Sequence, residues 1–223
     1  MTNISENLLK TKRISNIKNA ELTKQRIMLA AKQEFSSYGF DGARVDEIAK
    51  RAQVNKQLIY YYFKNKDNLF VEILKESFSN LRKTEQLLDL VNCNAFESIL
   101  KLVRANWLYY SKNPELIYFL ASENLLHGRH LKQHNKEFSE INAPWLELTK
   151  SIIEKGRVDK TIRTDIDPAQ LNISIAGLII FSIMNQYTLS VSLGEDLTTN
   201  EAKSNRINSI LDTISSWIKP KVN

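Results

Sequence analysis

Hydrophobic residues recur along this chain at the spacing of amphipathic helices, and no long stretch alternates as a strand would. Over residues 21–38, four apolar positions share one helical face: Ile27, Ala30, Ala31 and Phe35. Gly39 and Gly42 follow, and two glycines within four residues permit a left-handed turn. The pattern therefore predicts a helix that ends near residue 38.

Two short helices are predicted next, over Val45–Ala52 and Lys56–Phe63, with only residues 53–55 between them. Asn55 is a favoured N-cap for the second of these helices. Ile59 and Phe63 are four residues apart, so they point to the same side and are expected to face the core. A longer fourth helix is predicted over residues 66–90.

Only helices are predicted beyond residue 90. Their expected ranges are 95–111, 114–126, 131–159, 168–193 and 201–218. Pro144 is expected to kink or divide the third of these, and Pro168 occupies a favoured first-turn position. We therefore expect an all-α fold, in which an N-terminal three-helix helix-turn-helix domain (20–67) precedes a larger helical domain (68–223).

The composition supports a helical protein in a reducing compartment. Glycine and proline, which disfavour helix interiors, contribute only 6 and 4 of the 223 residues. The single cysteine, Cys93, excludes an internal disulfide framework. The N-terminus lacks the apolar core of a signal peptide, and the most apolar stretch, residues 173–184, is too short to span a membrane. A cytoplasmic location is expected.

The positive charge is confined to the first third of the chain. Residues 1–67 hold 13 Lys+Arg and 7 Asp+Glu, whereas residues 68–223 hold 18 of each. A basic module beside a neutral one is typical of a DNA reader joined to a separate sensor, although basic excess also serves solubility alone. The polar residues 1–19 are expected to form a basic, flexible arm or, alternatively, an extension of the first helix.

The second and third helices, with their tight turn, have the layout of a helix-turn-helix, whose last helix lies in the major groove. There Gln57 can pair with adenine and Leu58 can pack on a thymine methyl group. Tyrosine hydroxyls and lysines can bind phosphate. The residues expected to contact DNA are Arg44, Lys56, Gln57, Leu58, Tyr60, Tyr62 and Lys66. The alternative is that side chains at this helical spacing form core, and we expect this for Ile59, Phe63 and Tyr61.

This segment resembles the TetR/AcrR (tetracycline-repressor) family of transcriptional regulators. The matching residues are Arg26, Ile27, Ala30, Ala31, Phe35, Gly39, Phe40, Val45, Ile48, Ala49, Ala52, Val54, Ile59, Tyr60, Tyr61, Tyr62, Phe63, Lys66 and Leu69. Two positions depart from the family pattern: Gln53 stands where glycine is usual, and Leu58 where threonine is frequent. The first departure concerns the detail of the turn, and the second indicates a different operator.

The resemblance implies a homodimer that binds palindromic double-stranded operator DNA and is released by a small-molecule effector, most often as a repressor. It implies dimerisation through the last two long helices. Their apolar stripes are Leu171, Ile175, Leu178, Ile179, Ile183, Ile207, Ile210, Leu211, Ile214 and Trp217. The alternative is that these stripes form the core within one chain, and both interpretations can hold together.

The effector pocket is expected between the middle helices. Its candidate lining residues are Trp107, Tyr110, Tyr118, Phe119 and Asn124, each of which could equally be plain core. A second resemblance, to a C-terminal subgroup of the family, rests on residues 123–127 with Phe181, Asn185 and Thr188. Some members of that subgroup control catabolic genes, so the regulated operon is expected to be catabolic or to encode efflux.

The sequence also bears on metal binding, on enzymatic activity and on a purely structural DNA-binding role. His127, His130 and His134, with Glu123, could share one helical face and bind a transition metal, but Gly128 and neighbouring cations favour a solvated cluster. The chain lacks a phosphate-binding glycine loop, so no enzymatic activity is expected. A purely structural DNA-binding protein would not need the long neutral half. No metal and no cofactor are expected.

Overall fold

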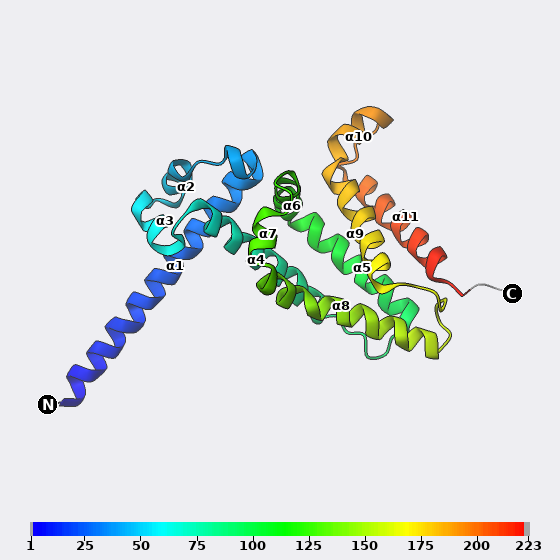
Figure 1. Ribbon diagram of the computed structural model, residues 1–223, viewed down its shortest axis with the longest axis horizontal. Coiled ribbons are helices and arrows are strands. Elements are labelled where there is room, and N and C mark those ends of the chain that lie inside the picture. Colours follow the sequence, from blue (N-terminus) through cyan, green and yellow to red (C-terminus); the bar gives the residue numbers. More distant parts are fainter. Residues whose placement is uncertain (1, 221–223) are drawn as a thin grey trace.

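The computed structural model describes residues 2–220, with side chains described from residue 19 onward. This part of the chain contains helices and no strands, so the predicted all-α fold is confirmed (Figure 1). The helices are α1 (Thr2–Gly42), α2 (Val45–Ala52), α3 (Lys56–Phe63), α4 (Lys66–Gln86), α5 (Ala95–Lys112), α6 (Glu115–Leu125), α7 (Arg129–Gln133), α8 (Asn135–Val158), α9 (Pro168–Met184), α10 (Gln186–Leu193) and α11 (Asn200–Ile218).

The first three helices and the start of α4 enclose one hydrophobic cluster, which holds Ile27, Phe35, Ile48, Ile59, Phe63 and Phe70. Gly39 breaks α1 with a φ of 66°, a left-handed conformation that glycine adopts without steric cost. The predicted turn after residue 38 therefore exists, although helical geometry resumes through Gly42. At its other end α1 begins at Thr2, so the backbone follows the helical alternative for residues 2–19.

A second cluster fills the C-terminal domain between α5, α8, α9 and α11. Its members include Val103, Ile153, Leu171, Ile179 and Ile214, each at most 1% exposed. Close approach of α8 to α5 depends on Gly156, because a Cβ there would lie 2.6 Å from side-chain atoms of both Ala95 and Ile162. This contact holds the end of α8 against the start of α5.

Helix α4 joins the two halves. Its first part, from Leu69 to Leu74, belongs to the N-terminal cluster, and Leu81 belongs to the C-terminal one. Phe119 from α6 and Phe138 from α8 also enter the N-terminal cluster. The two domains therefore share packed side chains as well as a helix.

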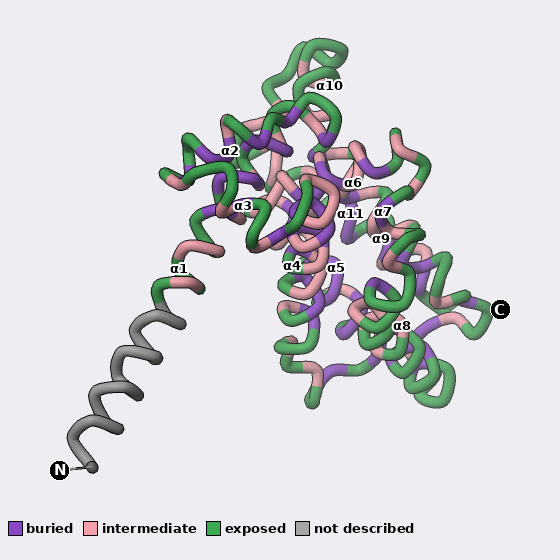
Figure 2. Tube along the Cα trace, turned by 60° about the vertical axis from the view of Figure 1, so that its left-hand side comes forward, coloured by how far each residue is buried: buried purple, intermediate pink, exposed green. Residues whose placement is uncertain are grey.

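Several element boundaries differ from those predicted. The expected helix over 131–159 is divided at His134 into α7 and α8, and Pro144 remains inside α8. The expected helix over 168–193 is two helices, α9 and α10, bent by 71° at Asn185. Figure 2 colours α10 as exposed or intermediate, and none of its residues is buried. Within residues 2–220, no single helix has the length and hydropathy of a membrane span; only α9 and α10 taken together across their bend do.

Candidate nucleic-acid interface and effector pocket

Helix α3 presents a mixed polar and aromatic face away from the core. The Asn55 side chain caps it by accepting the N–H of Leu58 at 2.8 Å, as the sequence predicts. Ile59 and Phe63 are buried and hold the helix against α1 and α4. The exposed side carries Lys56 and Gln57, while Leu58 is half-buried. This exposed side is the part of the molecule suited to enter a DNA groove.

The three consecutive tyrosines of α3 differ in exposure. Tyr61 is 79% exposed and Tyr60 39%, whereas Tyr62 is half-buried and packs against the core. The expectation that Tyr61 belongs to the core is wrong. Tyr61 lies two residues from both Ile59 and Phe63, and positions two apart point to different sides of a helix. Its ring meets that of Tyr62 at 5.2 Å between centroids.

Basic side chains flank this face. The ammonium of Lys56 is 2.9 Å from Asp46, and this hydrogen bond raises the pKa of Lys56, so the lysine stays charged. Arg44 is exposed, and its backbone N–H donates to the buried Glu34 at 3.2 Å. Lys66 donates to the carbonyls of Asp41 and Ala43 at 3.3 and 2.8 Å, so it fixes the end of α1 and keeps a third donor.

The turn between α2 and α3 is held by Gln53 in a left-handed conformation, with φ of 52° and ψ of 48°. The N–H of Gln53 bonds to the carbonyl of Lys50, and that of Val54 to the carbonyl of Ala49. Glycine reaches this conformation without the steric cost that a side chain brings, which explains why glycine is usual in the resembling family. Gln53 retains the turn at the expense of some backbone strain.

A buried polar junction, which we call the His130 clasp (His130, Glu123 and Asp67), connects the two domains. His130 is fully buried, with Nδ1 2.7 Å from Glu123 Oε2 and Nε2 3.2 Å from Asp67 Oδ1. Its ring packs on Phe40 and Phe70, with centroids 4.6 and 5.1 Å away. The clasp therefore joins α6 and α7 to the end of α1 and the start of α4.

Two further contacts strengthen the junction. The backbone N–H of Phe40 donates to the Ser122 hydroxyl at 2.9 Å, so α6 holds α1 where α1 is broken at Gly39. Arg129 pairs with Asp67 at 3.1 Å and lies over the Phe40 ring. Through these contacts α6 and α7 are attached to the end of α1 and the start of α4.

The three histidines do not converge on one point. His127 is exposed, in a turn with a φ of 56°, whereas His134 lies nearest Glu137 at 3.5 Å. Glu123 binds His130 instead of completing a ligand set. Over residues 2–220, no group of three or more His, Cys, Asp or Glu side chains is placed to hold a metal ion.

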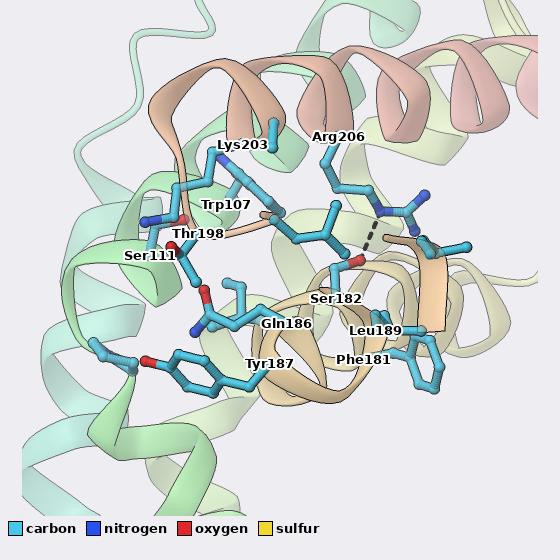
Figure 3. A pocket seen from close by; sticks show the side chains of 15 residues that line it. Trp107, Ser111, Phe181, Ser182, Gln186, Tyr187, Leu189, Thr198, Lys203 and Arg206 are labelled. Atoms are coloured by element: carbon cyan, nitrogen blue, oxygen red, sulfur yellow. Dashed lines mark hydrogen bonds between the residues drawn. The ribbon is translucent and has the colours of Figure 1, made fainter. Parts of the chain in front are cut away.

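The five residues predicted to line an effector pocket do not line a single cavity. Only Trp107 borders the pocket of about 440 Å³ shown in Figure 3. Tyr110 is buried and borders a different, much smaller cavity, and Phe119 belongs to the N-terminal core. Tyr118 is half-buried, and Asn124 is exposed and donates to the carbonyl of Leu120.

The larger pocket lies among the ends of five helices, α5, α6, α9, α10 and α11. Trp107 and Ser111 come from α5, and Pro114 precedes α6. The remaining walls come from the α9–α10 bend, the following loop and α11, and include Phe181, Ser182, Gln186, Tyr187, Thr198, Lys203 and Arg206. The wall residues at the α9–α10 bend were not predicted from sequence because residues 168–193 were expected to form one helix, although the polar pair Asn185-Gln186 marks the break.

A second polar cluster is enclosed between α4, α5, α8 and α9. Arg82 and Glu85 form an ion pair at 2.8 Å, and the Arg82 guanidinium lies 4.5 Å from the Trp145 ring centre. Burial raises the pKa of Glu85 from 4.5 to about 7, against the opposing effect of Arg82. The adjoining cavity of about 20 Å³ has room for roughly one water molecule.

The predicted dimer stripes are packed mainly within the chain itself. Leu171, Ile175, Ile179, Ile183, Ile210, Leu211 and Ile214 are buried, whereas Leu178, Ile207 and Trp217 are partly buried. The alternative of an intrachain core therefore describes the seven buried side chains, and dimerisation through Leu178, Ile207 and Trp217 stays a prediction. A different apolar stripe is left exposed, at Ile173, Phe181, Met184 and Tyr187, with Gly177 between them and nothing within 4 Å of its Cβ position.

Comparison with known proteins agrees with this architecture. The family described as bacterial regulatory proteins, tetR family, matches residues 27–73, and the tetracyclin repressor-like C-terminal domain matches residues 96–214. The HTH-type transcriptional repressor NicS of Pseudomonas putida is 32% identical over 193 residues, which cover 86% of this chain and 91% of NicS.

Solved structures share the fold at low sequence identity. A tetR-family regulatory protein from Rhodococcus RHA1 superposes with a TM-score of 0.71 at 16% identity, covering 90% of this chain and 98% of that one. FadR from Bacillus subtilis, solved with stearoyl-CoA, gives a TM-score of 0.63 at 20% identity, covering 87% and 98%. Because the C-terminal match alone spans more than half of the sequence and NicS matches nearly end to end, the chain belongs to the TetR family of bacterial regulatory proteins.

Proposed function

We propose that this protein is a ligand-responsive transcriptional repressor, which binds a palindromic operator as a homodimer and leaves it when a small-molecule effector occupies the C-terminal domain. The observation that carries the proposal is the exposed face of α3, joined by the His130 clasp to a domain with a ligand-sized pocket. NicS is named as a transcriptional repressor, which supports repression over activation as the action of this protein.

On the operator side, each α3 enters a major groove and the two copies read half-sites about one helical turn apart, or a multiple of it. Gln57 and Leu58 contact bases, and Lys56, Tyr60 and Arg44 contact phosphates. Tyr62 and Lys66 are proposed phosphate contacts as well, each with part of its side chain committed to the protein. Tyr61, the most exposed tyrosine of α3, joins this set.

The homodimer forms through the exposed apolar stripe of Ile173, Phe181, Met184 and Tyr187. Large apolar side chains gathered in one exposed patch, here along α9 and at the start of α10, mark interaction sites. A second copy of the chain is the proposed occupant. The exposed side of α11 carries short polar side chains in one row, at Ser204, Asn208, Asp212 and Ser216. Side chains of this size permit the close approach of another helix.

Effector binding changes the separation of the two reading helices. A ligand shifts an equilibrium only by its differential affinity for the two states. Here the link is α6, which reaches from the pocket at Pro114 to Ser122 and Glu123 at the DNA-binding domain. The regulated genes are proposed to be catabolic, or to encode efflux.

The dimer proposal is tested with two charge insertions at exposed apolar sites. Ile173→Glu, on the apolar stripe, should give monomers by sedimentation and lose operator binding. Leu87→Glu, at a still more exposed position beyond α4, should remain dimeric and bind operator normally. A dimeric Ile173→Glu protein with normal operator affinity would place the interface elsewhere.

A further inference from the structure

The pocket between α5, α6, α10 and α11 has a marked charge polarity. Figure 3 shows Lys203 and Arg206 extending from α11 on one side, with Trp107 from α5 and Gln186 and Tyr187 from α10 around them. Among the described residues that line the pocket, none is acidic. A molecule inside therefore meets two positive charges and no negative wall.

The two cations are differently held. Arg206 Nε donates to the Ser182 hydroxyl at 2.6 Å, and one of its terminal nitrogens is 3.4 Å from the Leu178 carbonyl, so the guanidinium is fixed in place. Lys203 interacts at longer range with Asp196, whose carboxylate already accepts from the backbone and hydroxyl of Thr198 at 2.9 and 2.6 Å. Asp196 is thus tied back into its own loop, and the ammonium of Lys203 is available to a ligand.

The rest of the wall suits an apolar body. Trp107, Phe181, Ile183, Leu189 and Leu193 contribute rings and aliphatic groups. Ser111, Thr198 and Gln186 supply hydrogen-bonding groups that can orient a ligand. A volume of about 440 Å³ falls within the range of small-molecule sites, which pair mainly apolar walls with a few placed polar groups.

We propose that this pocket binds a small organic acid, a monoanion with an aromatic or short aliphatic body, whose carboxylate lies against Lys203 and Arg206. This inference rests on the proposed function, because it names the chemical class of the effector. A cationic ligand would place its positive charge beside those of Lys203 and Arg206. A neutral ligand would give neither side chain a counter-charge.

The position of the site also explains how occupancy reaches DNA. Pro114 lines the pocket and starts α6, whose other end carries Ser122 and Glu123. Those two residues hold Phe40 and His130 at the domain junction. A ligand that pushes against the start of α6 therefore moves the contacts that position the helix-turn-helix.

The experiment is a calorimetric titration of the full-length protein with three acids, benzoate, hexanoate and indole-3-acetate, each paired with its uncharged amide. At least one acid should bind saturably, and its amide should bind at least about tenfold more weakly, which corresponds to about 1.4 kcal/mol. Saturable binding of none of the acids, or equal binding of acid and amide, would overturn the proposal.

Two variants locate the site. Lys203→Gln should weaken binding of the acid about tenfold, whereas Lys219→Gln, which removes an exposed lysine at the end of the same helix, should not. Thermal unfolding by circular dichroism confirms that both variants fold. If Lys203→Gln binds the acid as the parent does, the pocket assignment is wrong.

Operator release is measured separately, so the two proposals fail independently. An acid that binds through Lys203 and releases operator DNA supports both. One that binds through Lys203 without releasing DNA supports the pocket and contradicts its role as the effector site. One that releases DNA equally from the Lys203→Gln variant contradicts the pocket and leaves the repressor proposal intact.

Discussion

Replacing His130 by leucine tests whether the clasp holds the two domains together. Leucine keeps the apolar contact with Phe40 and Phe70 but removes the donor that lies 2.7 Å from Glu123 Oε2. Glu123 is 1% exposed, so water cannot take over that bond. Its other oxygen keeps two donors, the backbone N–H groups of His130 and Leu131, at 2.7 and 3.1 Å.

The size of the effect follows from these contacts. A hydrogen bond to a charged group contributes about 1.5–3 kcal/mol. Complete loss of a buried charge's partner costs about 3–5 kcal/mol, but the two remaining donors keep the His130→Leu variant below that range. We expect the free energy of unfolding to fall by about 2–3 kcal/mol, and Tm to fall by roughly 4–12 °C for a chain of this length.

Urea unfolding followed by circular dichroism measures this loss, with His134→Leu as the matched control. The His134 side chain is 29% exposed and makes one contact of 3.5 Å with Glu137, so its loss should change stability by about 1 kcal/mol at most. A His130→Leu variant as stable as His134→Leu would show that the backbone donors alone satisfy Glu123, and the clasp would no longer explain the domain coupling.

Three further predictions address other parts of the molecule. Gln53→Gly relieves a φ of 52° and should raise the free energy of unfolding by about 1 kcal/mol in urea titrations; a loss of stability would contradict the strain at this turn. Because burial raises the pKa of Glu85 to about 7, its protonation stabilises the fold below about pH 4.5, and this contribution is lost as the pH rises through 7. Glu85→Gln should remove that part of the pH dependence, and an unchanged profile in pH-dependent thermal melts would refute the assignment. Gln57→Ala should weaken operator binding by about 1–3 kcal/mol in fluorescence anisotropy and relax preference at one base pair, whereas the exposed Gln170→Ala should not.

Local sequence signals predict the N-terminal half well. The glycine-marked break within α1, the cap at Asn55 and the inward pair Ile59 and Phe63 each depend on neighbouring residues, and the structure has all of them. Tyr61 was wrongly expected in the core because its aromatic ring, and not its position on the helix, was taken to predict burial. Position within the turn decides exposure here, because two buried anchors fix the face of an eight-residue helix.

The C-terminal half is harder to predict because its helices are apolar on more than one side. In α9, Ile175 and Ile179 face the core, whereas Ile173 and Phe181 face outward. Periodicity finds both stripes but cannot tell which one the same chain covers. The pocket of about 440 Å³ depends on contacts between helices far apart in sequence, such as α5 and α11, which no local pattern encodes.

The clasp illustrates the same limit. Spacing along the chain grouped His130 with His127 and His134, whereas in the fold its ring nitrogens face Glu123 and Asp67. Asp67 is 63 residues away, at the start of α4. The sequence therefore favoured a solvated histidine cluster over a metal site, and for His130 this expectation is wrong, because its ring is buried between two carboxylates.

The most direct test of the account is a binding titration of the full-length protein against DNA from its own gene neighbourhood, at several salt concentrations. We predict a tight, sequence-specific complex with two protomers per site, whose affinity falls with salt as phosphate contacts are screened. Weak binding that is equal for all sequences and vanishes with salt would contradict the claim that this protein reads an operator.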